Sequence, residues 1–463
     1  MATPLDAPIR TLSIAFICWK AVLLLIAACS PGPGYDTSTN LLLSSLEYQG
    51  INLPSTARYL ISKLVRWDGI YFVQLSERGY LYEQEWAFGW GFTRMIHFIT
   101  IGRPHLSYLP LIRIALSLLG IPKYEGLEGL VGVLVAHTAH LLSTFCLYRL
   151  SLNLFISKRY ALTSALLYII SPAGIFLSAP FAESSCALFT FAGIYCFANS
   201  FGAGDGNNTF GHDILILLSG ISFGIATTLR SNGIFSGLLL LEEAFRVLFS
   251  IRDGLHLAKI RRLIITGLGG MCTGAGFLLP QYLAYQEYCG GAGHESTRPW
   301  CTNMLPSIYT FVQEYYWNCG PWRYWTFSNV PLFLLATPMI ALMFTSGFWA
   351  LRANALDNRS KQTVGDPVQL QNPQVFRSLA ISQLLLTALT FTSAHVQIIT
   401  RISSSYPVWI WYLAASVAGT EGLALPNVGD IIPKGLTFAT VGRFMVMYAV
   451  IQGGLFSSFL PPA

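Results

Sequence analysis

The clearest candidate for a catalytic group is the aspartate of Arg66-Trp67-Asp68, which precedes the aromatic stretch Gly69 to Phe72. Desolvation in apolar surroundings would raise the pKa of such a carboxylate, or Arg66 would hold it in its charged form. The indole of Trp67 offers a flat face on which a sugar ring can stack. Together these features suit a general base acting on a carbohydrate hydroxyl. The structural alternative is that Asp68 caps the following segment while Trp67 anchors it at a membrane surface.

Two further acids, Glu83 and Glu85, follow in the same region beside the indole of Trp86. Paired carboxylates suit acid and base roles, or the binding of a divalent cation. A solvated loop accounts for the same pattern, so both interpretations stay open. We treat Glu83 and Glu85 as candidate substrate-binding residues.

Two arginines are candidates for binding phosphate. Arg230 opens the sequence Arg230-Ser231-Asn232-Gly233 between two apolar runs, and Arg401 follows His395 farther along the chain. Guanidinium groups bind phosphate through charge-assisted, often bidentate contacts. The candidate substrate-binding residues here are Arg230, Asn232, His395 and Arg401. Ordinary anchoring at a membrane surface would explain each arginine singly.

The stretch from Trp300 to Trp325 is far richer in Trp, Tyr and Phe than the 14% of the whole chain. Such density suits a stacking wall for sugars, in which Trp300 and Tyr324 are candidate substrate-binding residues. Anchoring of the loop in the lipid headgroup zone is the simpler alternative.

The elements that position these residues are predicted by the composition. Of the 463 residues, 53% are apolar and only 11% are Asp, Glu, Lys or Arg, and the mean hydropathy is +0.52. Soluble domains carry about 25% charged residues, so a water-soluble fold is excluded. A membrane span needs roughly 20 apolar residues. We therefore expect an all-α polytopic membrane protein, organised as one integral membrane domain over residues 1–463.

About eleven transmembrane helices are predicted from the apolar runs. The first run carries Lys20 and exceeds the apolar core of a secretory signal, so we expect it to remain as an anchor. The runs cover residues 11–28, 127–148, 160–177, 181–199, 214–229, 234–249, 263–284, 330–351, 376–393, 406–418 and 437–459.

The distribution of Lys and Arg predicts the orientation. With the N-terminus in the cytosol, the short loops facing the cytosol hold most of these residues, as the positive-inside rule requires. Two sizeable loops then face the opposite, lumenal side. They are a first loop over residues 31–126, which contains Asp68, and an aromatic-rich second loop over residues 286–329.

The cysteines and histidines give weaker signals. Cys289 and Cys301 are close enough in the second loop to form a disulfide in an oxidising lumen, although three free thiols, with Cys319, would also fit. No paired C-x-x-C spacing indicates zinc.

His137 and His140 lie within a predicted span, where a hydrogen-bonded core role is the better interpretation. The glycosylation sequons at Asn207 and Asn358 fall in cytosolic loops and should be unused.

Several of these motifs, in this order, resemble the PIG-V family, the GPI mannosyltransferases of the endoplasmic reticulum, over nearly the whole chain. Single tripeptides are weak evidence, but the ordered set is specific. The motifs are Arg66-Trp67-Asp68, Glu83 with Glu85 to Phe88, Ser171 to Phe176, Ser178-Ala179-Pro180, Glu183-Ser184, Arg230 to Gly233, Arg298 to Cys301, Pro306 to Tyr309, Tyr324-Trp325, His395-Val396-Gln397 and Thr400-Arg401.

The resemblance implies the multi-span glycosyltransferase architecture called GT-C, in which an acid of the first lumenal loop serves the reaction. It implies transfer of an α-1,6 mannose from dolichol-phosphate-mannose to the first mannose of the GPI precursor, with inversion and with Asp68 as base. The implied partners are lipid-linked substrates, the endoplasmic reticulum membrane and, as an option, a small accessory membrane subunit. Nucleic acid, cofactor and metal are not expected.

The sequence also departs from the family pattern. Gln84 stands where the family has a histidine, and Ala87-Phe88-Gly89-Trp90 replaces Ala-Phe-Phe-Pro. No role is therefore carried over to residues 84 and 89 to 91. Two other functions remain as alternatives. One is a different mannosyltransferase that uses dolichol-phosphate-mannose, and the other, less favoured, is a lipid or ion transporter.

Overall fold

A computed structural model gives the fold of this chain and describes residues 5–101 except 33, 35 and 49, then 127–201, 209–290, 298–357, 370–418 and 438–461. Within these residues every regular element is helical. The sequons at Asn207 and Asn358 begin outside the described residues. The all-α fold class predicted from the sequence is confirmed for the described part of the chain.

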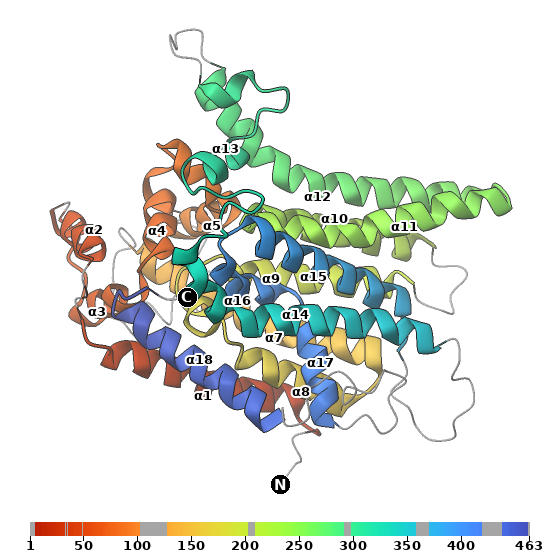
Figure 1. The fold of residues 1–463 in the computed structure, drawn as a ribbon, viewed down its shortest axis with the longest axis horizontal. Helices are drawn as coiled ribbons and strands as arrows, with labels where there is room; N and C mark the ends of the chain where they lie inside the picture. The colour runs from red at the N-terminus through yellow and green to blue at the C-terminus, as the bar shows by residue number, and fades with distance from the viewer. Residues whose placement is uncertain are drawn as a thin grey trace.

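Each of the eleven predicted apolar runs contains a helix, and these helices make up the body of the molecule (Figure 1). They are α1 (Pro8–Cys29), α7 (Glu128–Phe155), α8 (Lys158–Ile169), α9 (Glu183–Asn199), α10 (Thr209–Leu229), α11 (Gly237–Ser250), α12 (Leu257–Cys289), α14 (Val330–Asp357), α15 (Pro373–Ser393), α17 (Val408–Ala418) and α18 (Phe438–Ser457).

Seven of the helices in the described residues are long and apolar enough to cross a membrane, namely α1, α7, α10, α12, α14, α15 and α18. The remaining four are shorter than a full span, and turns interrupt the apolar runs of two of them. The run of α8 is broken at Pro172, whose ring cannot continue a helix, and the run of α11 begins with the 3-10 turn η4 (Ser231–Ser236). Helices α9 and α17 have 17 and 11 residues.

Most of the smaller elements lie toward one end of the bundle, where Figure 1 shows α2, α3, α4, α5 and α13, whereas the 3-10 turn η5 (Ile251–Asp253) joins α11 to α12. They build the two predicted loops and the turns between spans. Those of the first loop are α2 (Ser38–Tyr48), α3 (Ser55–Leu64), α4 (Asp68–Arg78), η1 (Glu83–Ala87) and α5 (Trp90–Ile101). Those of the second loop and of the turns are η3 (Gly174–Leu177), η6 (Pro299–Thr302), α13 (Ile308–Tyr315), η7 (Phe327–Asn329), η8 (Val396–Ile398), α16 (Ile399–Ile402) and η9 (Ser403–Ser405).

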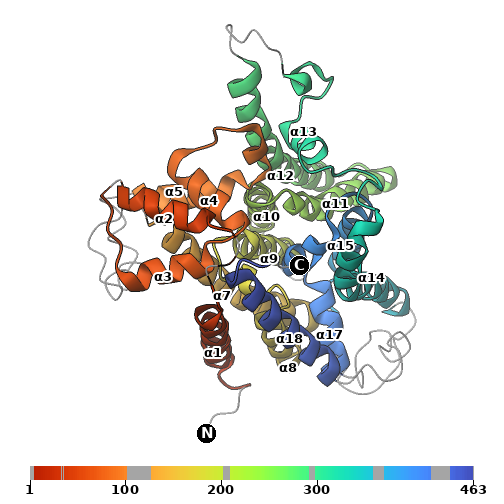
Figure 2. The ribbon, with the colours of Figure 1, turned by 60° about the vertical axis from the view of Figure 1, so that its left-hand side comes forward.

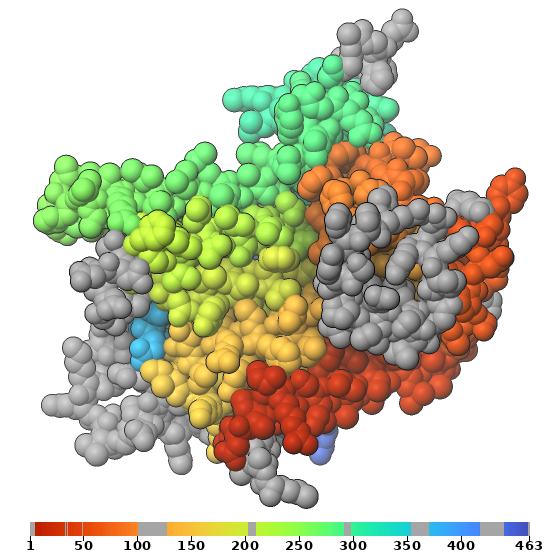
Figure 3. All heavy atoms as spheres, turned by 180° about the vertical axis from the view of Figure 1, so that it is seen from behind, coloured from red at the N-terminus to blue at the C-terminus, as the bar shows by residue number. Residues whose placement is uncertain are grey.

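The helices stack in successive bands. Figure 3 shows the surfaces of α1 in red, α7 in orange-yellow, α10 in yellow-green and α12 in green, one beside the next. Figure 2 shows α7, α9 and α10 in the middle of the molecule. Helix α17 is hydrophobic all round, as expected of a helix that its neighbours cover on every side. Its residues from Val408 to Ala415 are at most 3% exposed.

Glycines allow α10 and α12 to pack backbone against backbone. A Cβ added to Gly220 would lie 2.3 Å from the Cα of Gly269, and one added to Gly276 would lie 2.2 Å from the carbonyl oxygen of Gly224. Such close approach of small residues is typical of helix pairs in membranes. The packing brings the end of α10, which leads into Arg230, beside the segment of α12 that follows Gly276.

The ends of α1 and α18 lie together. A Cβ added to Gly34 would be 2.4 Å from the carbonyl oxygen of Ser458, and the rings of Trp67 and Phe459 are 5.4 Å apart. Helix α1 begins at the opposite end of the bundle, so its start lies far from the end of α18 (Figure 1).

Candidate active site

The candidate active site is a cavity of about 660 Å³ at the end where the two loops meet. Helices α4, α10, α12, α13 and α16 all contribute to its wall. Five of the predicted site residues line it, namely Trp67, Asp68, Arg230, His395 and Arg401. The other six, Arg66, Glu83, Glu85, Asn232, Trp300 and Tyr324, are not among the lining residues.

Asp68 lies at the start of α4, directly after a sharp turn. Trp67 has φ of 54°, which is uncommon for a residue with a side chain and costs on the order of 1–3 kcal/mol. Asp68 is the first residue of the helix, where the helix dipole favours a carboxylate. Its side chain is 39% exposed, and Asp68 lines the cavity. The capping alternative for Asp68 is wrong, because Trp67 holds the capping position and its side chain makes no capping hydrogen bond.

Asp68 belongs to a chain of four charged groups. The Nη1 atom of Arg401 donates to Oδ2 of Asp68 at 3.0 Å, and the Nε atom of the same arginine lies 3.4 Å from Oε1 of Glu183. Arg230 donates to that same Oε1 at 2.6 Å. Two guanidinium groups and two carboxylates thus balance one another at the wall of the cavity.

Burial and aromatic rings fix Arg401 in this chain. Its guanidinium lies 5.0 Å from the ring centre of Phe176 and 5.3 Å from that of Phe181, within the range of cation–π contact. Burial alone would lower the pKa of Arg401, but the carboxylates of Asp68 and Glu183 more than offset this and raise it. Arg401 therefore stays charged and its position is fixed before any substrate binds.

Arg66 does not hold the charge of Asp68, so that expectation is wrong. Its Nε atom donates to the carbonyl of Ser62 at 2.8 Å, and its guanidinium lies 4.6 Å from the ring centre of Phe459. The turn at Trp67 is the physical reason, because it sends Asp68 forward into α4 and leaves Arg66 packed back along α3.

Glu85 organises the first loop. Its carboxylate accepts hydrogen bonds from Arg78 at 2.6 Å and from the backbone N–H groups of Leu81 and Tyr82 at 2.8 and 3.1 Å. Burial acts to raise the pKa of Glu85, but these hydrogen bonds and the charge of Arg78 lower it below its usual value. Between the two acids, Gln84 lines the cavity.

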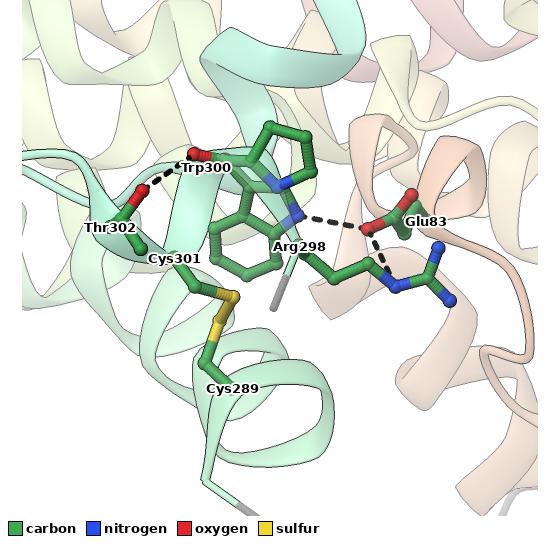
Figure 4. The surroundings of a disulfide bond; sticks show 7 residues. Glu83, Cys289, Arg298, Trp300, Cys301 and Thr302 are labelled. Carbon is green, nitrogen blue, oxygen red and sulfur yellow. Dashed lines mark hydrogen bonds and ion pairs between the residues drawn. A yellow bond between two sulfur atoms is a disulfide. The ribbon is translucent and has the colours of Figure 1, made fainter. Parts of the chain in front are cut away.

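Glu83 connects the first loop to the second (Figure 4). Its Oε1 accepts a hydrogen bond from the indole N–H of Trp300 at 2.9 Å, and the Nε atom of Arg298 lies 3.7 Å away. Trp300 is fully buried, and the next residue, Cys301, forms a disulfide with Cys289 at the end of α12. The contact therefore ties the acidic turn η1 to a covalently closed part of the second loop.

His395 lines the cavity and is held from two sides. Its Nε2 lies 3.0 Å from the carbonyl oxygen of Trp317, which can only accept, so Nε2 donates this hydrogen bond. The ring of Tyr324 stacks on it at 4.6 Å, while the hydroxyl of Tyr324 donates to Gln397 at 3.1 Å. Tyr324 thus supports His395 from outside the cavity.

Asn232 contributes its backbone carbonyl to the structure around the site. Its carbonyl accepts a hydrogen bond from the hydroxyl of Tyr406 at 2.9 Å. The neighbouring Gly233 is packed against α10, where a Cβ would lie 2.6 Å from the carbonyl carbon of Ala226. Only glycine fits this approach, and the resulting tight turn directs Arg230 toward Glu183.

Sequence reasoning did not assign a site role to Glu183. A signal was available, because a lone acid at the start of an apolar run marks a group that needs a partner. It also missed Tyr71, Gln281 and Tyr309, which line the cavity. Tyr71 and Tyr309 lie in stretches that the sequence singled out, whereas Gln281 has no distinctive local motif.

No group of three or more His, Cys, Asp or Glu residues in the described part of the chain is arranged to hold a metal ion. Of the two intramembrane histidines, His137 is half-buried and hydrogen-bonded, whereas His140 is buried but neither of its ring nitrogens has a hydrogen-bond partner among the described residues, so the expected hydrogen bond is wrong for His140. His137 Nδ1 contacts the carbonyl of Val133 at 2.8 Å, and His140 lies between the rings of Phe16 and Tyr168 at 5.2 and 5.0 Å.

Comparisons with known proteins agree on one family. A family model described as Mannosyltransferase (PIG-V) matches residues 10–463. The GPI mannosyltransferase 2 of Chaetomium globosum is 42% identical over 480 residues, covering 98% of this chain and 96% of that protein. The GPI mannosyltransferase 2 of Gibberella zeae is 37% identical, covering 98% of each chain.

Among solved structures, the chain is similar to the apo oligosaccharyltransferase of Archaeoglobus fulgidus, with a TM-score of 0.43 and 12% sequence identity. The match covers 96% of this chain and 56% of that one, so this chain spans little more than half of the oligosaccharyltransferase. The family match and the two curated relatives extend over nearly the whole sequence. The chain therefore belongs to the mannosyltransferase (PIG-V) family.

Proposed function

We propose that this protein transfers the second mannose, in α-1,6 linkage, from dolichol-phosphate-mannose to the mannosyl-glucosaminyl-phosphatidylinositol intermediate. Membership of the PIG-V family and the curated relatives support a mannosyltransferase of GPI-anchor biosynthesis. The observation that carries the finer proposal is an exposed carboxylate, Asp68, which lies in the cavity wall within a cluster of two arginines and a second acid.

The reaction is a single displacement. The 6-hydroxyl oxygen of the acceptor mannose attacks the anomeric carbon of the donor, and the bond from that carbon to the phosphate oxygen breaks. Asp68 accepts the hydroxyl proton, and dolichyl phosphate leaves with the electron pair of the broken bond. Attack from the face opposite the leaving group converts the β-linked donor into an α-linked product.

Arg401 and Arg230 stabilise the leaving phosphate. Both line the cavity, and guanidinium groups placed before the reaction stabilise charge that develops in the transition state. Phosphate leaves as a stable anion, so no second acid is needed to protonate it. When Asp68 becomes protonated, the cluster of two arginines and two acids changes from neutral to a net charge of +1. That charge faces the departing dianion.

The cavity wall has an aromatic part, which suits the sugar of a lipid-linked donor, and an apolar part, which suits its lipid chain. The rings of Tyr71 and Phe88 stack at 4.7 Å beside Trp67, which supplies aromatic faces for sugar rings. Phe277 and Pro280 of α12, with Leu332 of α14, form an apolar part of the wall on membrane-spanning helices. A polyprenyl chain is suited to that part.

The cavity faces the lumen of the endoplasmic reticulum, and the N-terminus faces the cytosol. The disulfide between Cys289 and Cys301 supports this orientation, because it lies in the second loop, which also forms the cavity wall. Disulfides persist in oxidising compartments such as this lumen. In this orientation the chain is a multi-pass protein of the endoplasmic reticulum membrane.

No metal is needed, because the two arginines supply the positive charge that a divalent cation would otherwise provide. Treatment of purified enzyme with a chelator is therefore expected to leave transfer unchanged. Loss of transfer on chelation, with recovery on addition of manganese, would contradict this part of the proposal.

The function is tested by removing the chain from cells and analysing their GPI precursors. We expect a precursor with one mannose to accumulate, and we expect the wild-type chain to restore its extension while Asp68→Asn at equal abundance does not. Accumulation of a precursor that already carries two mannoses, or of an incomplete N-glycan or protein O-mannosylation instead, would assign the chain to a different mannosyl transfer.

A further inference from the structure

We propose that Glu183 is a positioning residue that holds the two arginines of the cavity wall, an inference that rests on the proposed phosphate-linked donor. Glu183 is the first residue of α9, and its side chain is fully buried. It does not line the cavity, so it acts through the arginines and not on the substrate.

A single oxygen atom makes both contacts. Oε1 of Glu183 lies 2.6 Å from Nη1 of Arg230 and 3.4 Å from Nε of Arg401. Oε2 is buried and has no hydrogen-bond partner among the described residues. The shared oxygen therefore fixes the two guanidinium groups relative to each other, as binding of one phosphate by both would require.

The neighbouring chain fixes Glu183 in turn. The hydroxyl of Ser184 donates to the carbonyl of Leu177 at 3.2 Å, which ties the start of α9 to η3. The N-terminal end of a helix favours a negative charge. A buried carboxylate between two guanidinium groups is stable only while it is paired, so the position of Glu183 and those of the arginines depend on one another.

Charge balance gives the expected consequence of neutralising this residue. With glutamine at position 183, two arginines face only one carboxylate, Asp68. No shared anionic oxygen then holds the two guanidinium groups in place for one phosphate. Turnover should therefore fall, and binding of the leaving phosphate should weaken.

The test compares Glu183→Gln with Glu243→Gln in the full-length protein. Glu243 is a matched control, because its fully buried carboxylate also bridges two arginines, Arg246 at 2.8 Å and Arg262 at 2.9 Å. It lies on α11 near the start of α12, away from the cavity-lining segment of α12. Loss of a buried ion pair is therefore matched between the two variants.

Four quantities are measured on purified protein: the folded fraction, kcat per folded molecule, the donor KM and inhibition by dolichyl phosphate. For Glu183→Gln we expect kcat to fall at least tenfold, with a higher donor KM and weaker inhibition by dolichyl phosphate. Glu243→Gln should lose folded protein but keep kcat within threefold of wild type. A smaller loss of kcat in Glu183→Gln, unchanged inhibition by dolichyl phosphate, or an equal loss in Glu243→Gln overturns the proposal.

Glu183→Asp covers the case in which the glutamine variant does not fold. It keeps the charge but shortens the side chain by one methylene group, so we expect kcat between one third and one tenth of wild type. A kcat equal to that of wild type would overturn the positioning role. Wild-type protein that transfers no mannose in the same assay overturns the proposed function itself, whereas active wild type with unaffected Glu183 variants overturns only this inference.

Discussion

Arg401 and Asp68 are 333 positions apart in the sequence, yet their side chains are joined by a 3.0 Å hydrogen bond across the cavity wall. The arginine comes from α16 near the end of the chain, and the aspartate begins α4 in the first loop. The same cation that would attract the donor phosphate therefore already contacts the proposed base. We expect a bound phosphate to compete with Asp68 for Arg401 and to leave the carboxylate freer to accept a proton.

Replacing Asp68 with asparagine is expected to reduce mannosyl transfer by about 10²–10⁴-fold, the usual contribution of a general base. Protein abundance should stay near wild type, because asparagine keeps the shape of the side chain. The measurement is transfer from labelled donor in microsomes, normalised to protein level.

Asp36→Asn is the control for this substitution. Asp36 also lies in the first loop, where it accepts a hydrogen bond from the backbone N–H of Ser38 at 2.7 Å, and it does not line the cavity. Equal activity of Asp68→Asn and Asp36→Asn would refute the assignment of Asp68 as base.

The two substitutions Arg401→Lys and Arg401→Ala should have different effects. Alanine leaves Glu183 with one partner instead of two, and breaking a buried ion pair costs about 3–5 kcal/mol, so we expect less folded protein. Lysine keeps the charge but lacks the planar fork that reaches Asp68 and Glu183 together. Arg401→Lys should therefore fold and lose most transfer. Thermal unfolding and mannosyl transfer, measured on the same preparation, separate the loss of folded protein from the loss of activity. A fully active Arg401→Lys variant would contradict the prediction.

Trp300→Phe is expected to destabilise the protein more than Arg298→Ala does. The indole N–H of Trp300 is buried at 2.9 Å from Glu83, and its loss leaves a buried carboxylate oxygen without its main donor, at a cost of about 1–3 kcal/mol. Arg298 is half exposed and 3.7 Å away, so its removal should cost about 1 kcal/mol or less. Chemical denaturation of both variants measures the order, and the reverse order would disprove the bridging role of Trp300.

Gly89→Ala is expected to impair both folding and transfer. A Cβ at this position would lie 1.8 Å from the carbonyl oxygen of Leu229, directly before Arg230, so one of the two backbones must move. Overpacking of this kind costs about 1–3 kcal/mol. Gly267→Ala in α12 is the control, since no heavy atom lies within 4 Å of its added Cβ. Thermal unfolding and transfer should change in the first variant only.

The sequence by itself determined the helical segments and singled out Asp68 as a candidate base. Apolar runs are a local property of the chain, so each run contains a helix in the structure. Asp68 could be recognised from its immediate neighbours, because an acid in an aromatic and apolar stretch is unusual wherever the chain folds. The bounds of α8 and α11 were harder to predict, since a proline and a 3-10 turn interrupt their apolar runs.

The partners of the proposed base were decided by the tertiary structure. Arg66 is its neighbour in sequence, but the positive φ of Trp67 separates their side chains. Arg401 and Glu183 reach the site from elements far along the chain, and nothing in their local sequence encodes that meeting. Ion pairs depend on distances of a few ångströms, which arise only once α4, α9, α10 and α16 have packed together. For that reason the charge cluster followed from the fold, whereas the helices and Asp68 followed from the sequence.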